Sequence, residues 1–327
     1  MQSRRAVLKC IGAASTIGLT GVVTASEPEV KVVTELRDLG NEVSQEEGVK
    51  IQKDELTSFT DSGRLVLGSA RPKNNEVKIV GMTAAVNRDG ETRQFIGATA
   101  DDTRVSEVHD DVRSYARQFT EELSGQQVTT RVKSEEPWEL FDDNVYKSYN
   151  YEGDVVSDSK VFNWTGSRSD YDRWGTHNTF KLTPADGGLG DSILTCQMDH
   201  DWSNYGGTGL AVVGNQPATS DNNAQIGVDM SLSSAPSGSI GFSYTQKSDV
   251  KRTVTQDPKV TNYDWQFVDF DHGEDTSQFD TGTEIAADKG SLGLQDALVT
   301  LDGNEQFYRN GVLYESGFNQ FFELVSG

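Results

Sequence analysis

The stretch QIGVDMSLSSAPSGSIGFSYTQ, Gln225–Gln246, contains two runs in which apolar residues alternate strictly with small or polar ones. Because successive side chains of a β-strand point to opposite faces, each run predicts a strand with one apolar and one polar face. The connector Ser234–Gly238 holds a proline and a glycine, which favour a turn, so we expect a β-hairpin. Its apolar face would comprise Ile226, Val228, Met230, Leu232, Ile240, Phe242 and Tyr244, with Asp229 and Ser243 on the polar face.

The chain around this hairpin, from Trp138 to Gly327, has the pattern of a β-sandwich. Short apolar or alternating runs are separated by clusters of Gly, Asp and Asn, and helical periodicity is essentially missing. Asn310-Gly311 near the end is the strongest short signal for a hairpin turn. The pattern predicts an antiparallel β-sandwich domain over residues 138–327, with strands in runs such as Val145–Tyr151, Lys160–Trp164, Asn178–Leu182, Ser192–Met198, Trp265–Phe270 and Leu298–Asp302.

A small α+β domain is predicted before the sandwich, over residues 64–130. Glu76–Val86 and Thr92–Ala98 read as a hairpin whose turn ends in Asp89-Gly90, and His109–Ser124 carries the apolar stripe of a helix. Residues 26–63 are acidic and weakly patterned, which indicates a linker or pro-segment. The charged stretch Val128–Pro137 is the expected domain boundary.

The first 25 residues predict an export signal. Arg4 and Arg5 stand in a twin-arginine context, a short apolar segment follows, and Val23-Thr24-Ala25 fits a signal-peptidase site. We therefore expect an extracellular protein that folds before it is exported by the twin-arginine pathway.

Composition limits the class of protein further. The net charge is −22, and Asp and Glu are spread along the whole chain, as expected of a halophilic, acidic surface that keeps a protein soluble in high salt. Without a basic patch to neutralise phosphates, nucleic acid is not an expected partner. Of the two cysteines, Cys10 lies in the leader, so Cys196 cannot form an intramolecular disulfide in the mature chain.

No catalytic motif stands out in the sequence. The four histidines are scattered without ligand spacing, and the metalloprotease, nucleophile-elbow, phosphate-loop and dinucleotide motifs are missing. We expect a protein that is not an enzyme and that uses no cofactor and no metal. Asp269–Asp280 is acidic enough for a calcium loop, but its spacing favours a solvated surface loop.

Trp164, Trp174 and Trp202 stand in glycine-rich surroundings. Most tryptophans belong to the core, yet three on the loops of one sandwich would also suit sugar stacking or a membrane interface. Both interpretations stay open from the sequence.

Four stretches after Trp138 are informative together: Ser234-Ala235-Pro236-Ser237, Ser243-Tyr244-Thr245-Gln246, the run Val254, Gln256, Val260 and Trp265, and Leu313-Tyr314-Glu315-Ser316-Gly317-Phe318-Asn319. In their order and rough spacing, residues 138–327 show a resemblance to the leukocidin/hemolysin family of secreted β-barrel pore-forming toxins. It implies a leukocidin-like sandwich that binds a target-cell membrane, assembles as a homo- or hetero-oligomer and forms a pore through hairpin 225–247. The apolar face would then meet lipid, and Asp229 and Ser243 would line the lumen.

Two other interpretations compete with a pore. An alternating hairpin usually packs its apolar face into its own sandwich. Leu298–Tyr314 is also similar to the terminal hairpin of laminin-G and concanavalin-like lectins, which implies a secreted carbohydrate-binding module with a surface glycan as partner. A cell-surface structural protein without pore activity is part of the same alternative.

Overall fold

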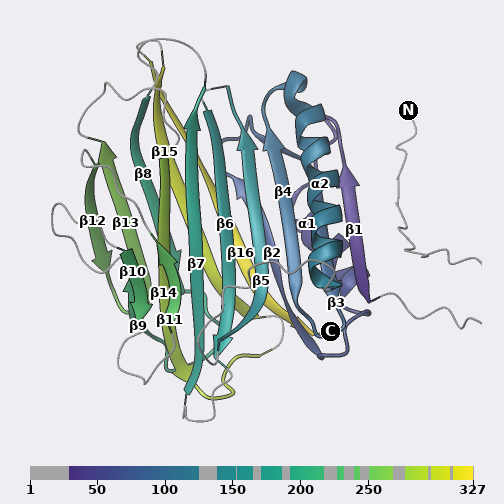
Figure 1. Ribbon diagram of the computed structural model, residues 1–327, viewed down its shortest axis with the longest axis vertical. Helices are drawn as coiled ribbons and strands as arrows, with labels where there is room; N and C mark the ends of the chain where they lie inside the picture. The colour runs from purple at the N-terminus through teal and green to yellow at the C-terminus, as the bar shows by residue number, and fades with distance from the viewer. Residues whose placement is uncertain are drawn as a thin grey trace, which may run out of the picture.

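The protein is mainly β, and two sheets packed face to face form a sandwich (Figure 1). The computed structural model describes residues 29–124, 138–151, 153–164, 171–185, 192–216, 227–231, 239–243, 250–267, 277–293, 296–309 and 312–326. The expected fold class, a mainly β chain with an antiparallel sandwich, is confirmed.

The first sheet has eight strands in the order β1-β3-β4-β5-β6-β7-β14-β9, and all its pairs are antiparallel except β4–β5. Its strands are β1 (Val30–Leu36), β3 (Lys78–Asn87), β4 (Thr92–Thr99), β5 (Trp138–Tyr149), β6 (Gly153–Trp164), β7 (Tyr171–Pro184), β9 (Ala211–Gln216) and β14 (Ser277–Asp288).

The second sheet has six strands in the order β12-β13-β8-β15-β16-β2. They are β2 (Arg64–Pro72), β8 (Ser192–Asp201), β12 (Val250–Gln256), β13 (Val260–Phe267), β15 (Asp296–Arg309) and β16 (Val312–Ser326). A third, two-stranded sheet consists of β10 (Gly227–Ser231) and β11 (Ser239–Ser243).

The hairpin predicted around Asp89-Gly90 is confirmed as β3–β4. Gly90 has a φ of 87°, a left-handed conformation that glycine adopts without strain. Asn87 closes the turn, because its backbone N–H donates to the Glu91 carbonyl at 3.2 Å.

Two helices pack on the strands: α2 lies on the outer face of the first sheet, and α1 packs between β2 and the core-facing side of β3. The predicted helix is α2 (Val105–Leu123), which follows the short 3-10 turn η1 (Asp102–Arg104) and begins about one turn before the expected start at His109. Val108, Val112 and Phe119 pack against strands of the first sheet (Figure 1). Helix α1 (Gln45–Leu56) is capped by Ser44, whose side chain accepts from the Glu47 backbone N–H at 3.1 Å.

The arrangement differs from the expected division into a linker, an α+β domain and a separate sandwich. Strand β4 pairs with β5 across the expected boundary, and β2 pairs with β16, so residues 64–124 complete both sheets of the sandwich. Residues 26–63 contain β1 and α1. The apolar side chains Val30, Val32 and Leu36 of β1 pack with α2. The surrounding sequence is rich in charged residues, so this alternation was not interpreted as a strand.

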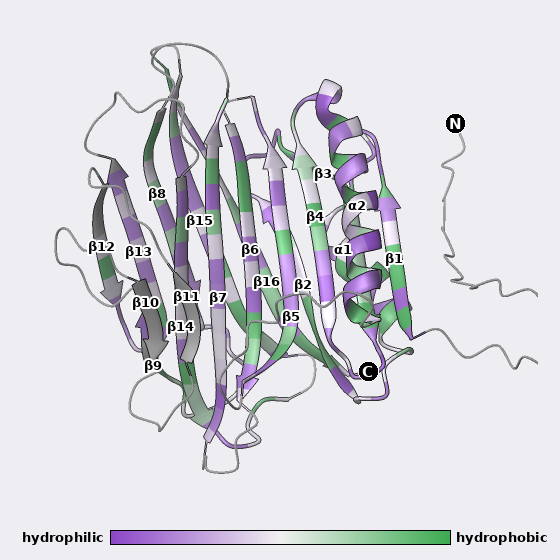
Figure 2. Ribbon diagram, viewed as in Figure 1, coloured by the Kyte–Doolittle hydropathy of each residue, from purple (hydrophilic) through white to green (hydrophobic). Residues whose placement is uncertain are grey.

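The main core lies between the two sheets. Figure 2 shows apolar and polar residues alternating along β5, β6 and β7, as a sheet with two different faces requires. Large aromatic side chains from both sheets are fully buried there, among them Tyr146, Phe180, Trp265, Phe318 and Phe322.

Candidate functional site

The hairpin β10–β11 is the candidate functional element. Its strands pair antiparallel, with Val228 opposite Phe242 and Met230 opposite Ile240. Asp229 lies opposite Gly241, and Ser243 opposite Gly227, so this register continues the alternation seen in the sequence. The other residues assigned to the apolar face, Ile226, Leu232 and Tyr244, lie outside the described residues, as do Arg4 and Arg5 of the leader.

The hairpin stands apart from both sheets of the sandwich. Within the described residues, β10 and β11 form a sheet of their own, and neither belongs to the strand order of the other two sheets. In the chain, the hairpin follows β9 and precedes β12, which are the end strands of the eight-stranded and six-stranded sheets. It is therefore an insertion between two sheet edges.

Hydrogen bonds join these two edges, between β9 and the C-terminal end of β12. The Asn215 side chain on β9 donates to Gln256 Oε1 on β12 at 2.9 Å. Gln256 Nε2 donates back to the Val212 carbonyl at 3.4 Å, and the Val212 N–H donates to the Pro258 carbonyl at 3.0 Å. We call Asn215, Gln256 and Pro258 the root clamp.

Charged groups lie next to the root on β7 and β14. Arg173 forms an ion pair with Glu284, whose side chain is fully buried. Burial raises the pKa of Glu284 to about 7, although Arg173 opposes this shift. His177 Nε2 lies 3.5 Å from Asp280, and its own pKa is lowered by burial.

Asp280, the last residue of the expected acidic loop, is part of strand β14. Burial acts to raise the pKa of Asp280, but hydrogen bonds with His177 and Thr179 outweigh it and leave the pKa lowered. The rest of that loop, from Asp269 to Asp275, lies outside the described residues. Within the described chain, no group of three or more His, Cys, Asp or Glu side chains could hold a metal ion.

The three tryptophans singled out in the sequence lie in different surroundings. Trp174 is 2% exposed and Trp202 is fully buried, with its indole N–H donating to Thr283 Oγ1 at 2.9 Å. Both are core residues, so neither offers a ring face to a sugar or a membrane. Trp164 is half-buried at the end of β6 and remains the surface candidate.

Trp164 belongs to a small aromatic cluster apart from the main core. Its ring meets Trp138 edge-on at 5.2 Å between centroids, and the Arg173 guanidinium lies 5.2 Å from its centroid. Phe162 and Leu140 complete the cluster. The cation–π contact connects it to the charged groups beside the root.

A row of polar side chains inside the sandwich was not predicted. The cross-strand partners Gln94, Asn144, Ser159, Asn178 and Thr281 follow one another across β4, β5, β6, β7 and β14, and all five are buried. In the sequence most of their neighbours are polar as well, a pattern that is typical of an exposed strand face, so their burial could not be predicted.

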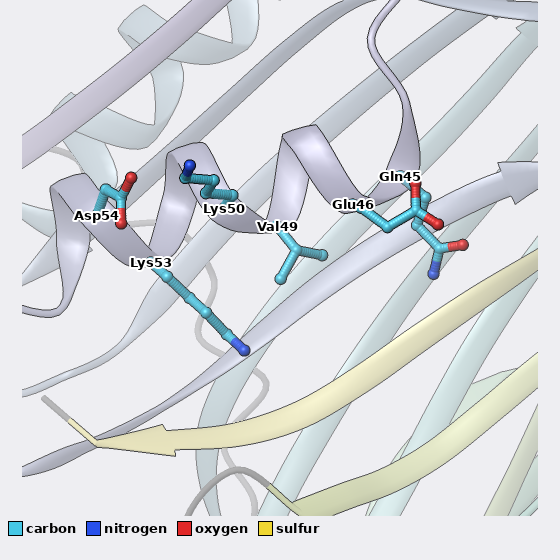
Figure 3. A pocket seen from close by; sticks show the side chains of 6 residues that line it. All are labelled: Gln45, Glu46, Val49, Lys50, Lys53 and Asp54. Atoms are coloured by element: carbon cyan, nitrogen blue, oxygen red, sulfur yellow. The ribbon is translucent and has the colours of Figure 1, made fainter.

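A shallow groove of about 400 Å³ runs along α1 (Figure 3). It is lined by Gln45, Glu46, Val49, Lys50, Lys53 and Asp54. Figure 3 shows the Lys53 side chain extending toward the strands below the helix, and its ammonium forms an ion pair with Glu323 of β16. The groove is remote in sequence from the hairpin, and its lining is mostly charged.

Comparisons with known proteins found no matching family and no matching curated protein. A solved structure described as a "Pore forming protein" is 11% identical, with a TM-score of 0.34, over 58% of this chain and 96% of its own. The membrane-inserted form of the Clostridium perfringens NetB toxin is 9% identical, with a TM-score of 0.29, over 58% of this chain and 97% of its own. No helix in the described chain has the length and apolarity needed to cross a membrane.

Proposed function

We propose that the protein is exported and inserts hairpin β10–β11 into a target membrane as one subunit of an oligomeric pore. The observation that supports this proposal is the position of the hairpin. Within the described residues its strands pair only with each other, outside both sheets, and in the chain they lie between the edge strands β9 and β12. A hairpin that belonged to the sandwich would extend one of those sheets.

The alternation of the hairpin suits this role. Inside a bilayer every backbone N–H and carbonyl must be hydrogen-bonded within the protein, and closing the hairpins of several subunits into one barrel meets that requirement. Membrane strands need about 9–11 residues with alternating faces. The runs Gln225–Ser233 and Ser239–Lys247 meet the lower limit of that length.

The root clamp joins the two edge strands that flank the hairpin in the chain. Because Asn215 and Gln256 connect β9 with the C-terminal end of β12, the two sheets are held together at this edge. Assembly would then change the hairpin and leave the core packed. The subunits are expected to form a homo- or hetero-oligomer on the target-cell surface.

The test compares lysine at two neighbouring positions of the hairpin. Phe242→Lys places a charge on the lipid face, which costs about 2–4 kcal/mol per chain near the bilayer midplane. Ser243→Lys places the same charge on the lumen face. We expect the purified mature protein to release dye from liposomes at high salt, Phe242→Lys to abolish release, and Ser243→Lys to retain it.

Thermal unfolding of the same variants separates the pore from an ordinary core hairpin. If the hairpin is not part of the core, both variants keep the melting temperature of the wild type. A Phe242→Lys chain with a much lower melting temperature, or liposomes that stay intact with the wild-type protein, would contradict the proposal.

Carbohydrate binding is the second candidate, favoured by the six-stranded sheet. A row of Asn262, Asp199, Asp302 and Asn319 crosses β13, β8, β15 and β16. Asn262 Nδ2 donates to Asp199 Oδ1 at 2.5 Å, and Asn319 Nδ2 donates to Asp302 Oδ2 at 3.0 Å. Amides and carboxylates together can donate to and accept from sugar hydroxyls. This function predicts polysaccharide binding without dye release.

A further inference from the structure

Hydrogen bonds between polar side chains join the two sheets inside the sandwich. Gln320 of β16 donates to Asn144 Oδ1 of β5 at 2.8 Å. Its Oε1 accepts from Ser157 at 2.5 Å and from Ser159 at 2.9 Å, both on β6. Gln320 is fully buried, so one side chain of the second sheet ties together two strands of the first.

Asp142 of β5 lies at one end of this network. Its Oδ1 accepts from Thr92 Oγ1 at 2.5 Å and from Gln94 Nε2 at 2.8 Å, while its Oδ2 has no hydrogen-bond partner among the described residues. Asp142 is fully buried, and a Cβ added to Gly68 on the opposite sheet would lie 3.2 Å from its Oδ2. Its two donors are uncharged.

Glu305 of β15 is the corresponding group on the second sheet. It is 2% exposed and lies between its cross-strand partners Cys196 and Ser316. The Ser316 hydroxyl bonds to its carboxyl group, but Oε2 has no partner among the described residues. Both sheets thus direct a carboxyl group into the interior.

The charged groups around Asp142 do not neutralise it. Arg93 and Asp143, its neighbours on β4 and β5, act in opposite directions, and the Arg64 guanidinium lies over the Phe141 ring at 5.2 Å. Burial outweighs the hydrogen bonds from Thr92 and raises the pKa of Asp142 to about 7.

The surroundings of Glu305 are similar. Burial raises its pKa to about 7, with Lys73 acting to lower it and Asp302 to raise it. Lys73 forms an ion pair with Asp302, so it is not available as a counter-ion for Glu305. Tyr146 and Cys196 face Glu305 and stay uncharged, because burial raises the pKa of each.

We propose that the interior of the sandwich is a proton-binding site, in which Asp142 and Glu305 are held as neutral acids and whose loss of protons loosens the packing of the two sheets. The geometry supports this, since each carboxyl is buried, has one unpartnered oxygen and faces no unpaired cation among the described residues. An isolated carboxylate in such surroundings is costly, so the group binds a proton instead.

The direction of the pH effect follows from these raised values. The folded protein holds both protons between about pH 4 and pH 7, where the unfolded chain has released them. The free energy of unfolding therefore decreases as the pH rises through this window, and these two groups change it no further above about pH 7. Buried His200 acts in the opposite direction, because burial lowers its pKa to about 3 and its contribution is lost as the pH falls.

The experiment compares thermal unfolding of the full mature chain from pH 4.5 to 8.5. Asp142→Asn with Glu305→Gln replaces both acids by neutral groups of similar shape and leaves His200 in place. Glu139→Gln with Glu315→Gln is the matched control, since these two lie exposed on β5 and β16. We expect the wild type and control to lose about 5 °C or more in Tm relative to the Asp142/Glu305 variant as the pH rises.

Equal pH slopes for the wild type and the Asp142/Glu305 variant would overturn the proposal. If the variant does not fold, the infrared carbonyl band of protonated carboxyl groups is recorded in a Glu284→Gln, Asp158→Asn background, because burial also raises the pKa of Glu284 to about 7 and of Asp158 to about 6. The band is expected at pH 6 and should disappear by pH 8.5. A spectrum of this background with every carboxyl group ionised at pH 6 would equally overturn the proposal.

Discussion

Individual polar side chains in the interior decide how the two sheets fit together. In His200 both ring nitrogens have hydrogen-bond partners: Nδ1 lies 2.8 Å from Thr176 Oγ1, and Nε2 lies 2.8 Å from Thr281 Oγ1. Burial lowers the pKa of His200 to about 3 and keeps the ring neutral, while these partners satisfy both of its nitrogens. A buried polar group with both partners in place costs little, whereas one that loses a partner costs about 1–3 kcal/mol.

The tryptophans give a prediction at this scale. Trp202→Ala removes a fully buried ring and should lower the free energy of unfolding by about 3–5 kcal/mol. Trp164→Ala removes a half-buried ring and should cost less than about 2 kcal/mol. Denaturant titration measures both. Equal losses would show that Trp164 is as much a core residue as Trp202.

The same pair tests the carbohydrate alternative. If a polysaccharide quenches or shifts the tryptophan fluorescence of the wild type, Trp164→Ala should remove that response without unfolding the protein. A response that survives in Trp164→Ala would place the sugar elsewhere, with the polar row around Asp199 as the next site to mutate.

At the scale of elements, the shared sheets matter most. Strands β2, β3 and β4 supply core residues such as Val66, Met82 and Ile96, which pack in one cluster with Trp174 and Phe318 from the later strands. The two parts of the chain therefore build a single core. The hairpin β10–β11 is the exception, since its strands pair only with each other within the described chain.

A fragment that begins at Trp138 tests the shared core. It lacks β2, which pairs with β16, and β4, which pairs with β5, so it exposes two sheet edges and part of the core. We expect no cooperative thermal transition and no near-ultraviolet circular dichroism from this fragment. A fragment with a sharp, native-like transition would show that the later strands form a domain of their own.

Local patterns predicted the local elements of this fold. The β3–β4 hairpin, α2 and the hairpin at Val228–Phe242 follow from turn residues and periodicity. Pairing over long distances carries no such signal, which is why β2 beside β16 and the parallel pair β4–β5 were not predicted. The root clamp and the buried row around Gln320 depend on that pairing and were missed with it.

At the scale of the whole molecule, the described strands form one sandwich and one separate hairpin. Both sheets end on the same side, β9 and β12 meet at the root clamp, and the chain between them carries β10 and β11. Any cost of placing a hairpin in lipid is repeated in every subunit of a ring. Membrane activity should therefore depend steeply on which face of the hairpin carries a charge.

The most direct test of this account is a scan of single cysteines along the hairpin. Each residue of β10 and β11 is changed to cysteine in a Cys196→Ala background and labelled with a dye whose emission shifts to the blue in lipid. On addition of liposomes we predict a blue shift at Val228, Met230, Ile240 and Phe242, and none at Asp229 or Ser243. No shift at any position, or equal shifts at neighbouring positions, would contradict insertion of the hairpin.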